Sequence, residues 1–229
     1  MSASRTCCIG AAFLAVLAAA ACGGTARAGA APTPRPTGAS TAEIEAIYRA
    51  RMDSARMHVS EADVHFMTGM IGHHAQALVM AGFAPSHGAS ASVQTLCARI
   101  INAQTDEIAT MQQWLRDRGQ PAPEVHVMGS TVMVHGDEHA MHMPGMLTPE
   151  QMQELDRARG AEFDRLFLTF MIQHHRGAVT MVHDLFGTDG AGQDEAVFKF
   201  ASDVQVDQTT EIARMERMLS ALTAAGHAP

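Results

Sequence analysis

Two pairs of adjacent histidines carry the clearest chemical potential in this sequence. His73-His74 and His174-His175 each follow a Met-Ile-x triplet, and apolar residues flank both pairs at helical spacing. We therefore expect all four imidazoles to be at least partly buried. A neutral imidazole is a common metal ligand and also a hydrogen-bond donor, so the two pairs fit either a metal site or a buried polar layer.

Two glutamates are expected at the same depth as the histidines. Glu107 and Glu211 interrupt apolar stripes on the helices that follow the two pairs. A buried carboxylate is costly unless a donor or a cation lies nearby, and the histidines are the natural partners. Such a His–Glu layer satisfies both groups without a metal and can fix the register of a bundle, so the metal site and the structural layer both stay open.

A second group of candidate ligands lies between the two halves of the chain. Residues 126–146 contain four His and five Met, in a segment expected to be a loop with no need of large apolar side chains. Spacings of one and two residues allow several of these side chains to converge on one ion, and thioether with imidazole suits Cu(I) or Ag(I). The alternative is a Met-rich flap over apolar helix faces. The candidate ligands here are His135, His139, Met141, His142, Met143 and Met146.

The histidine pairs belong to an internal repeat. Residues 63–81 (DVHFMTGMIGHHAQALVMA) match residues 164–182 (DRLFLTFMIQHHRGAVTMV), and residues 104–115 match residues 208–219. Each half then forms a helical hairpin, and no strand-like alternation is apparent. The prediction is an all-α fold, a four-helix bundle of two duplicated hairpins joined by one long crossover, with an additional N-terminal helix.

Capping residues set the expected helix boundaries. Ser60 with Asp63 and Thr148 with Gln151 form the expected N-terminal capping pairs, and Gly119 ends a helix. The expected helices span about residues 41–58, 61–84, 90–118, 149–159, 161–186 and 193–222. The repeats cover about residues 60–118 and 161–222, and the crossover covers residues 119–160.

The N-terminal region has the composition of an export signal. Arg5 precedes a run of small and apolar residues that is too short to span a bilayer, and the run ends at Cys22. Residues 1–22 are therefore expected to be a lipoprotein-type signal peptide, with a lipid on Cys22 as the only link to a membrane. Ala19 stands where a lipobox usually has Leu, so cleavage to a soluble secreted protein stays open.

The rest of the chain divides into a linker and a folded part. Residues 23–39, rich in Pro, Ala and Gly, should be a flexible tether, and residues 40–229 should form a single duplicated helical domain. Cys97 is then the only thiol in the folded part. Packing rather than an intramolecular disulfide must hold the fold.

Composition argues against nucleic acid as a partner. The formal net charge is −8, and only Lys199 among the 16 basic residues is a lysine, so the chain has no basic stripe. Its 13 His and 17 Met accompany one Trp and one Tyr. This balance of soft ligands over aromatic residues points to metal chemistry.

The paired motifs resemble the bacterial domain of unknown function 305 family. The resemblance is carried by MIGHHAQALVMA and MIQHHRGAVTMV, each followed by a Q-x-x-E-I-x-x-M helix. It implies a ferritin-like four-helix fold, export to the cell envelope and, for members with an assigned role, copper binding linked to copper tolerance. It also implies that the paired histidines act with sulfur ligands at Met70, Met80, Met171 and Met181.

The favoured hypothesis is an envelope protein that sequesters or carries copper, as Cu(I) or Cu(II), through His and Met ligands and without an organic cofactor. It would lie in the periplasm or on the outer face of the cytoplasmic membrane, with a copper-delivery protein or a second copy of the chain as candidate partners. One alternative is a metal-free envelope interaction module with a structural His–Glu layer. A ferritin-like redox enzyme is the other, and it is disfavoured because the sequence lacks the Glu-x-x-His spacing of di-iron centres.

Overall fold

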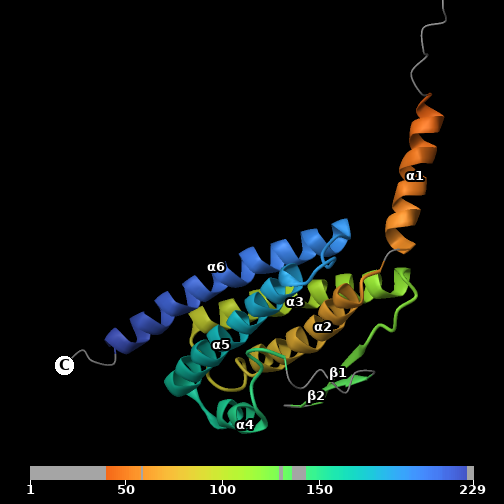
Figure 1. Cartoon of the computed structure of the whole chain (residues 1–229). Coiled ribbons are helices and arrows are strands. Elements are labelled where there is room, and N and C mark those ends of the chain that lie inside the picture. Colours follow the sequence, from red (N-terminus) through yellow and green to blue (C-terminus); the bar gives the residue numbers. More distant parts are fainter. Residues whose placement is uncertain (1–39, 58, 129–130, 136–142, 226–229) are drawn as a thin grey trace, which may run out of the picture. The chain divides into compact units, whose positions relative to one another are not determined.

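Helices make up most of the structure. The computed structural model describes residues 40–57, 59–128, 131–135 and 143–225. Within these ranges the helices are α1 (Thr41–Met57), α2 (Glu61–Gly82), α3 (Ala91–Asp117), α4 (Pro149–Arg157), α5 (Gly160–Gly187) and α6 (Glu195–Ala225) (Figure 1). The predicted all-α class is confirmed, and each expected helix is present with ends that differ by a few residues. The ferritin-like four-helix assignment stays a prediction.

Helix starts follow the capping residues of the sequence. The Ser60 hydroxyl accepts hydrogen bonds from backbone N–H groups in the first turn of α2. Thr148 and Gln151 form a reciprocal capping box at the start of α4. Asp63 does not complete the pair expected with Ser60, because its carboxylate accepts from the distant backbone N–H of Gly192.

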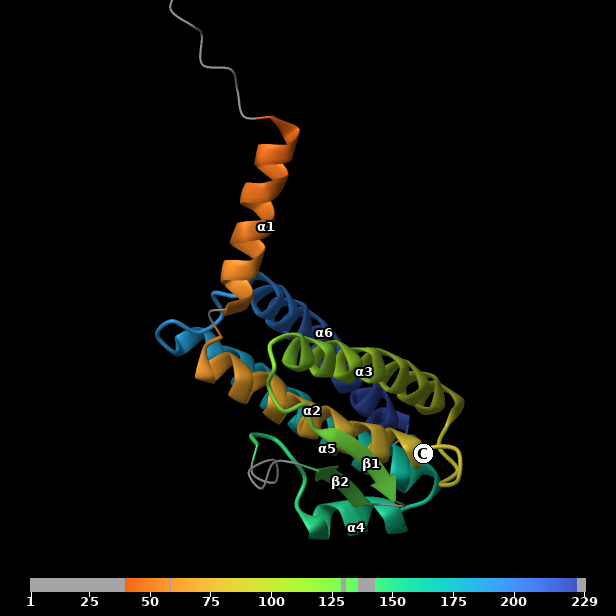
Figure 2. The same cartoon turned by 90° about the vertical axis from the view of Figure 1, so that its right-hand side faces the viewer.

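Two helical hairpins form the body of the structure (Figures 1 and 2). Helix α2 packs against α3, α5 packs against α6, and the two hairpins meet through α2 and α5. Helix α4, in the crossover, lies against α5. This arrangement brings the middle of α2 next to the middle of α5, where the two histidine pairs lie.

The crossover contains a β-hairpin that the sequence analysis does not predict. Strands β1 (Glu124–Met128) and β2 (Thr131–His135) pair antiparallel, with Val125 opposite Val134. Both strands lie against α2. The expectation of a loop without strands is wrong: β-branched Val alternates with other residues along both strands, a period-two pattern that favours β structure.

The apolar core consists of two clusters separated by the histidines. One cluster contains residues from the first half of α2 and the second half of α5, such as Phe66 and Leu185. The other contains residues from the second half of α2 and the first half of α5, such as Met80 and Phe167. The histidine pairs lie between these segments on both helices, so a polar layer divides the core.

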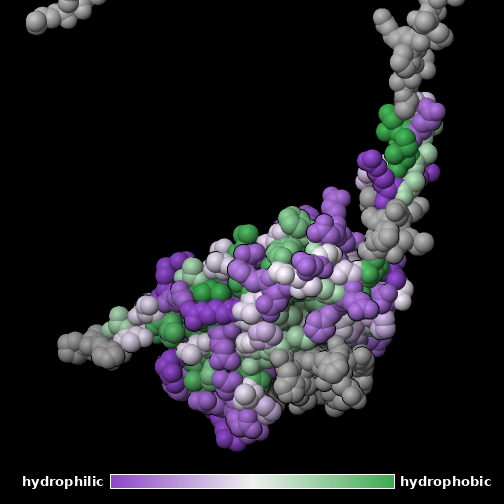
Figure 3. Space-filling view, viewed as in Figure 1, coloured by the Kyte–Doolittle hydropathy of each residue, from purple (hydrophilic) through white to green (hydrophobic). Residues whose placement is uncertain are grey.

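Polar and apolar residues are interspersed on the face shown in Figure 3. Helix α1 exposes Ile44, Ile47 and Tyr48. Across the described ranges, no helix combines the length and hydropathy needed to cross a membrane. The expected signal peptide, Cys22 and tether fall in residues 1–39, outside the described residues, and stay predictions.

Candidate metal centre

The four paired histidines come together in one buried layer between α2 and α5. His73, His74, His174 and His175 each have an exposed fraction of 0%. Each lies near the middle of its helix, with one apolar cluster on either side. The predicted burial is confirmed, and it is complete rather than partial.

The rings of the first histidines of the two pairs lie close together and are tilted relative to each other. The ring centroids of His73 and His174 lie 3.8 Å apart, with the ring planes inclined by 38°. Adjacent rings within each pair are 6.3 Å apart. Successive side chains on a helix point about 100° apart, so the first histidine of each pair faces the seam between α2 and α5 while the second faces the other helix of its own hairpin.

The His73 ring has a defined tautomer. Its Nε2 lies 3.0 Å from the carbonyl oxygen of Pro144, which can only accept, so Nε2 carries the proton. Burial, and then the neighbouring His74, lower the pKa of His73 to about 3, so the ring is neutral. Its Nδ1 is buried, and no residue in the described ranges makes a hydrogen bond to it. This nitrogen presents a bare lone pair, which is the form that binds a metal ion.

His174 has fewer partners still. Both of its ring nitrogens are buried without a hydrogen-bond partner among the described residues. The His73 backbone carbonyl interacts with this ring electrostatically, but outside hydrogen-bond geometry. Burial, and then the adjacent His73, hold the pKa of His174 well below its usual value. One nitrogen of a neutral imidazole always has a free lone pair, so His174 offers a second donor beside His73.

The second histidines each meet a glutamate from the other helix of their hairpin. His175 Nε2 donates to Glu211 Oε2 over 2.7 Å, and this bond opposes the lowering of the His175 pKa by burial. His74 Nε2 is also 2.7 Å from Glu107 Oε2, but the angles of that contact are outside hydrogen-bond geometry. The expected His–Glu partnership is confirmed in position for both repeats. As a hydrogen bond it is made in the second repeat.

Two glutamines extend the polar layer. Gln104 and Gln208 lie one helical turn before the two glutamates, and both are buried. The side-chain oxygen and nitrogen of Gln104 and the side-chain oxygen of Gln208 have no hydrogen-bond partner among the described residues. Protein interiors rarely hold so many unpaired polar atoms unless a water or an ion satisfies them. We call His73, His74, His174, His175, Gln104, Glu107, Gln208 and Glu211 the histidine layer.

A short segment of the crossover lies over the seam between α2 and α5. We call residues 143–147 the strap. Its Pro144 carbonyl bonds to His73, as described above. The Gln76 side-chain nitrogen donates to the Leu147 carbonyl over 3.1 Å, and the Leu147 N–H donates to the Gln76 side-chain oxygen over 2.8 Å. The strap is therefore fixed to α2 one turn beyond the histidine it contacts.

Glycines bring the strap close to α5. A Cβ on Gly177 would lie 1.9 Å from the Pro144 carbonyl oxygen, so any larger residue at this position forces the strap away. Gly145 has a positive φ of 77°, and a Cβ there would lie 2.6 Å from the Gln173 carbonyl oxygen. Both positions require glycine because backbone approaches backbone here.

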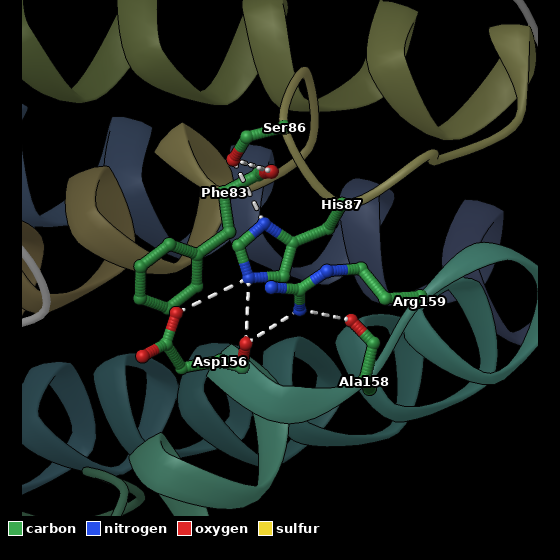
Figure 4. A network of polar contacts seen from close by, with 6 residues as sticks. All are labelled: Phe83, Ser86, His87, Asp156, Ala158 and Arg159. Atoms are coloured by element: carbon green, nitrogen blue, oxygen red, sulfur yellow. Dashed lines mark hydrogen bonds and ion pairs between the residues drawn. The ribbon is translucent and has the colours of Figure 1, made fainter.

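A fifth buried histidine shows a fully bonded imidazole in the same fold (Figure 4). His87 Nδ1 lies 2.8 Å from the Ser86 hydroxyl, and Nε2 lies 2.8 Å from the Asp156 carbonyl oxygen and 3.2 Å from its carboxylate. Arg159 donates to the same Asp156 carbonyl. These contacts join the α2–α3 loop to the end of α4. Neither nitrogen of His87 is left for a ligand, in contrast to His73 and His174.

The four methionines expected as ligands divide between the two apolar clusters. Met70 and Met181 belong to the cluster that contains Phe66 and Leu185, and Met80 and Met171 belong to the other. All four are buried. Their thioethers therefore flank the histidine layer on both sides rather than meeting at one point, and their role as ligands stays a prediction.

The crossover candidates are only partly described. Met143 and Met146 are half-buried residues of the strap. His135 is the last residue of β2, where it pairs with Glu124. His139, Met141 and His142 lie outside the described residues. Convergence of this set on one ion stays a prediction.

The donor set of the layer suits a soft ion of low coordination number. In the described part of the chain, no three His, Cys, Asp or Glu side chains are arranged to hold a metal ion together. The neighbouring imidazoles of His73 and His174 supply two neutral nitrogen donors. Cu(I) and Ag(I) form stable complexes with two or three such ligands, whereas Mg²⁺ and Ca²⁺ need a set of oxygen ligands that this pair lacks.

Sequence reasoning missed the residues around the histidine pairs, although the repeat held a signal for them. In the aligned repeats, Gln76 corresponds to Gly177 and Gly69 corresponds to Phe170. Gln76, Gly177 and Gly69 contact the strap. A single strap crosses two related helices, so its contacts with equivalent positions of α2 and α5 differ. The two repeats therefore have different residues at the positions that the strap contacts.

The fold and the layer together define a duplicated helical-hairpin protein with a buried histidine layer at its centre. The family model of domain of unknown function DUF305 matches residues 63–219. The chain belongs to the DUF305 family, which confirms the resemblance seen in the sequence. A search of curated proteins gave no match.

Solved structures of similar proteins cover most of this chain. A DUF305 protein from Streptomyces coelicolor, provisionally described as secreted, is 26% identical with a TM-score of 0.58, over 71% of this chain and 92% of that one. A DUF305 fragment from Deinococcus radiodurans is 29% identical with a TM-score of 0.58, over 71% and 97%. CopM in its Cu(I)-bound form is 25% identical with a TM-score of 0.51, over 69% and 96%. CopM has also been solved in Cu(II)-bound and Ag-bound forms.

Proposed function

We propose that the protein is an exported copper-binding protein that sequesters or carries copper and holds Cu(I) between His73 and His174. The observation that carries this proposal is the close pair of buried, neutral imidazoles whose free nitrogens have no hydrogen-bond partner in the described part of the chain. The similarity to CopM, which has been solved with Cu(I), Cu(II) and Ag, supports the choice of metal.

The surroundings of the pair favour a monovalent ion. Burying charge in an apolar site is costly, and the cost is smaller for one charge than for two. The imidazoles of His73 and His174 bring no charge of their own. The carboxylates of Glu107 and Glu211 contact the adjacent histidines, His74 and His175. These carboxylates offset the charge of a bound Cu(I) without coordinating it.

The crossover would add further sites. Its His and Met residues from His135 to Met146 are proposed as ligands of moderate affinity, as a carrier that must also release its ion requires. A copper-delivery protein or a second copy of the chain is the proposed recipient.

Export is proposed from the signal-like residues 1–22, with lipidation at Cys22. The provisional description of the Streptomyces coelicolor relative as secreted supports export. Mass spectrometry of the protein from its native host tests the lipid: an N-terminal Cys22 carrying acyl chains is expected. An unmodified N-terminus would instead show cleavage to a soluble form.

Competition with a chromogenic Cu(I) chelator tests copper binding. The wild-type protein should withdraw Cu(I) from the chelator, and the double variant His73→Gln with His174→Gln should withdraw at least one equivalent less. His87→Gln is the matched control, because it removes a buried imidazole whose nitrogens are both bonded. It should keep the wild-type capacity. Equal copper uptake by the double variant and the wild type would contradict the proposal.

A metal-free interaction module is the second candidate. The hydrogen bond between His175 and Glu211 favours it, because that bond satisfies both groups without an ion. Thermal unfolding separates the two functions, since a ligand that binds only the native state raises the Tm by mass action. A Tm that does not change on addition of Cu(I) would favour the module.

A further inference from the structure

A small cavity lies between the start of α2 and the end of α5, beside the strap. Its volume is about 160 Å³, enough for roughly five water molecules at about 30 Å³ each. His65 and Asp184, both exposed, line it from the two helices. The buried rings and methyls of Phe66 and Leu185 form an apolar wall. The cavity therefore connects solvent to the edge of the apolar core.

Two methionine side chains line this cavity. Met143 comes from the strap and Met181 from α5, and Met181 has an exposed fraction of 6%. Both contact the same spot on α2: a Cβ on Gly69 would lie 3.1 Å from the Met143 sulfur and 3.6 Å from the Met181 methyl. The absence of a side chain at Gly69 thus leaves the space in which the two methionine side chains lie next to each other.

The cavity adjoins the histidine layer. Pro144 lines the cavity, and its carbonyl oxygen accepts the hydrogen bond from His73. Two successive residues of the strap, Met143 and Pro144, therefore line the cavity, and the second of them also contacts His73. An ion held at Met143 and Met181 would lie beside the strap residue that contacts His73.

We propose that this cavity is an outer binding site for a soft monovalent cation, Cu(I) or Ag(I), held by Met143, Met181 and His65 on its way to the histidine layer. This inference rests on the proposed function of that layer. Two thioethers and an imidazole are a neutral, soft donor set. The exposed carboxylate of Asp184, which also lines the cavity, attracts cations from solvent. A hard cation would require a set of oxygen ligands, and among the described residues Asp184 is the only carboxylate that lines the cavity.

Titration of the protein with Ag(I), followed by the methyl signals of ¹³C-labelled methionine, tests the outer site. The Met143 and Met181 signals should shift together with the His65 ring signals. Met143→Leu should lower the Ag(I) stoichiometry by one equivalent, or weaken that equivalent at least tenfold. Met152→Leu is the matched control, because it changes a buried methionine on α4 that belongs to the other cluster.

A second variant removes no donor atom. Gly69→Ala places a Cβ 2.6 Å from the Met143 terminal methyl, so the flexible Met143 side chain must move away from α2. The helix itself should not be weakened, because Ala has a higher helix propensity than Gly. Gly69→Ala should lose the same equivalent of bound Ag(I) as Met143→Leu. Gly82→Ala, in the same helix but with open space around it, should bind Ag(I) like the wild type.

The outcomes separate the outer site from the proposed function. Full Ag(I) stoichiometry and unchanged affinity in both Met143→Leu and Gly69→Ala would overturn the outer site, even if the double variant of His73 and His174 loses an equivalent. Loss in the two outer variants, with none in the double histidine variant, would support the outer site and overturn the inner one.

Discussion

Asp63 and Asp164, which occupy the same position in the two repeats, each hold the loop of the opposite hairpin. Asp63 Oδ1 accepts from the backbone N–H of Gly192 over 2.7 Å, in the α5–α6 loop. Asp164 accepts from the backbone N–H of Ser90 over 3.1 and 3.3 Å, at the end of the α2–α3 loop. Both carboxylates are buried. The hairpins are therefore joined at both ends of the α2–α5 pair, with the histidine layer between.

Loss of either carboxylate should destabilise the fold. Asp63→Ala and Asp164→Ala each leave a loop N–H without its acceptor, at an expected cost of about 1–3 kcal/mol. The two contacts lie at opposite ends of the interface, so the costs should add in the double variant. Urea unfolding measures all three values. A coupling well above about 0.5 kcal/mol would show that the two ends do not act independently.

The histidine layer should make stability fall at acid pH. Burial lowers the pKa of His73 to about 3 and that of His174 well below its usual value, whereas both titrate near 6.5 in the unfolded chain. The unfolded state therefore binds more protons below pH 6.5, and the free energy of unfolding decreases as pH falls from about 6.5 towards 3. Each histidine contributes a slope of at most about 1.4 kcal/mol per pH unit.

Urea unfolding of the apo protein between pH 7.5 and 4.5 measures this slope. In the double variant His73→Gln with His174→Gln, the free energy of unfolding should change less with pH than in the wild type. Above pH 7.5 these two histidines should add almost no pH dependence to the stability of the wild type. An identical slope in the two proteins would show that other groups cause the acid sensitivity.

Gly177 should be intolerant of any side chain. Its Cβ would lie 1.9 Å from the Pro144 carbonyl oxygen, so the strap must move and its bond to His73 must lengthen or break. Gly177→Ala should cost about 1–3 kcal/mol in chemical denaturation, as overpacking does. Gly82→Ala, which adds a methyl in open space, should be neutral or stabilising by up to about 1 kcal/mol. Equal stability of the two variants would show that the strap is loosely held.

The two glutamates should differ in their contribution to stability. Glu211→Leu leaves the buried Nε2–H of His175 without an acceptor, at an expected cost of about 1–3 kcal/mol. Glu211→Gln retains an acceptor oxygen and should cost less. Glu107→Leu should also cost less than Glu211→Leu, because the contact of Glu107 with His74 is outside hydrogen-bond geometry. Unfolding midpoints of the three variants in the same buffer decide the order.

Cys97 should be inert in the native protein. Burial, and then the nearby Asp164, raise the pKa of its thiol to about 12, and 2% of the residue is exposed. The thiolate that reacts with alkylating agents is therefore almost absent at pH 8. Iodoacetamide should label the thiol in denaturant but leave it unmodified in buffer, as measured by intact mass. Rapid labelling in buffer would indicate that this part of α3 opens readily.

Local sequence signals determined the helices and the depth of the histidines. Apolar spacing and capping residues such as Ser60 and Thr148 act over a few residues, so they predict helix ends well. Apolar spacing around both His–His pairs predicts that the four imidazoles are at least partly buried, and their complete burial confirms it. The β-hairpin was missed because its His and Met residues were interpreted as ligands, while the valines between them favour strands.

What the tertiary structure alone decided is which atoms of the layer are bonded. Apolar spacing predicts burial for His73 and His174 alike, yet His73 has a hydrogen-bond partner whereas His174 has none among the described residues. The sequence analysis makes no prediction for His87, which has partners at both nitrogens. Those partners come from Asp156, Pro144 and Glu211, which lie far along the chain from the histidines that they contact. Helical periodicity determines the direction in which a side chain points. The non-local packing of the strap and the hairpins determines which atoms that side chain contacts.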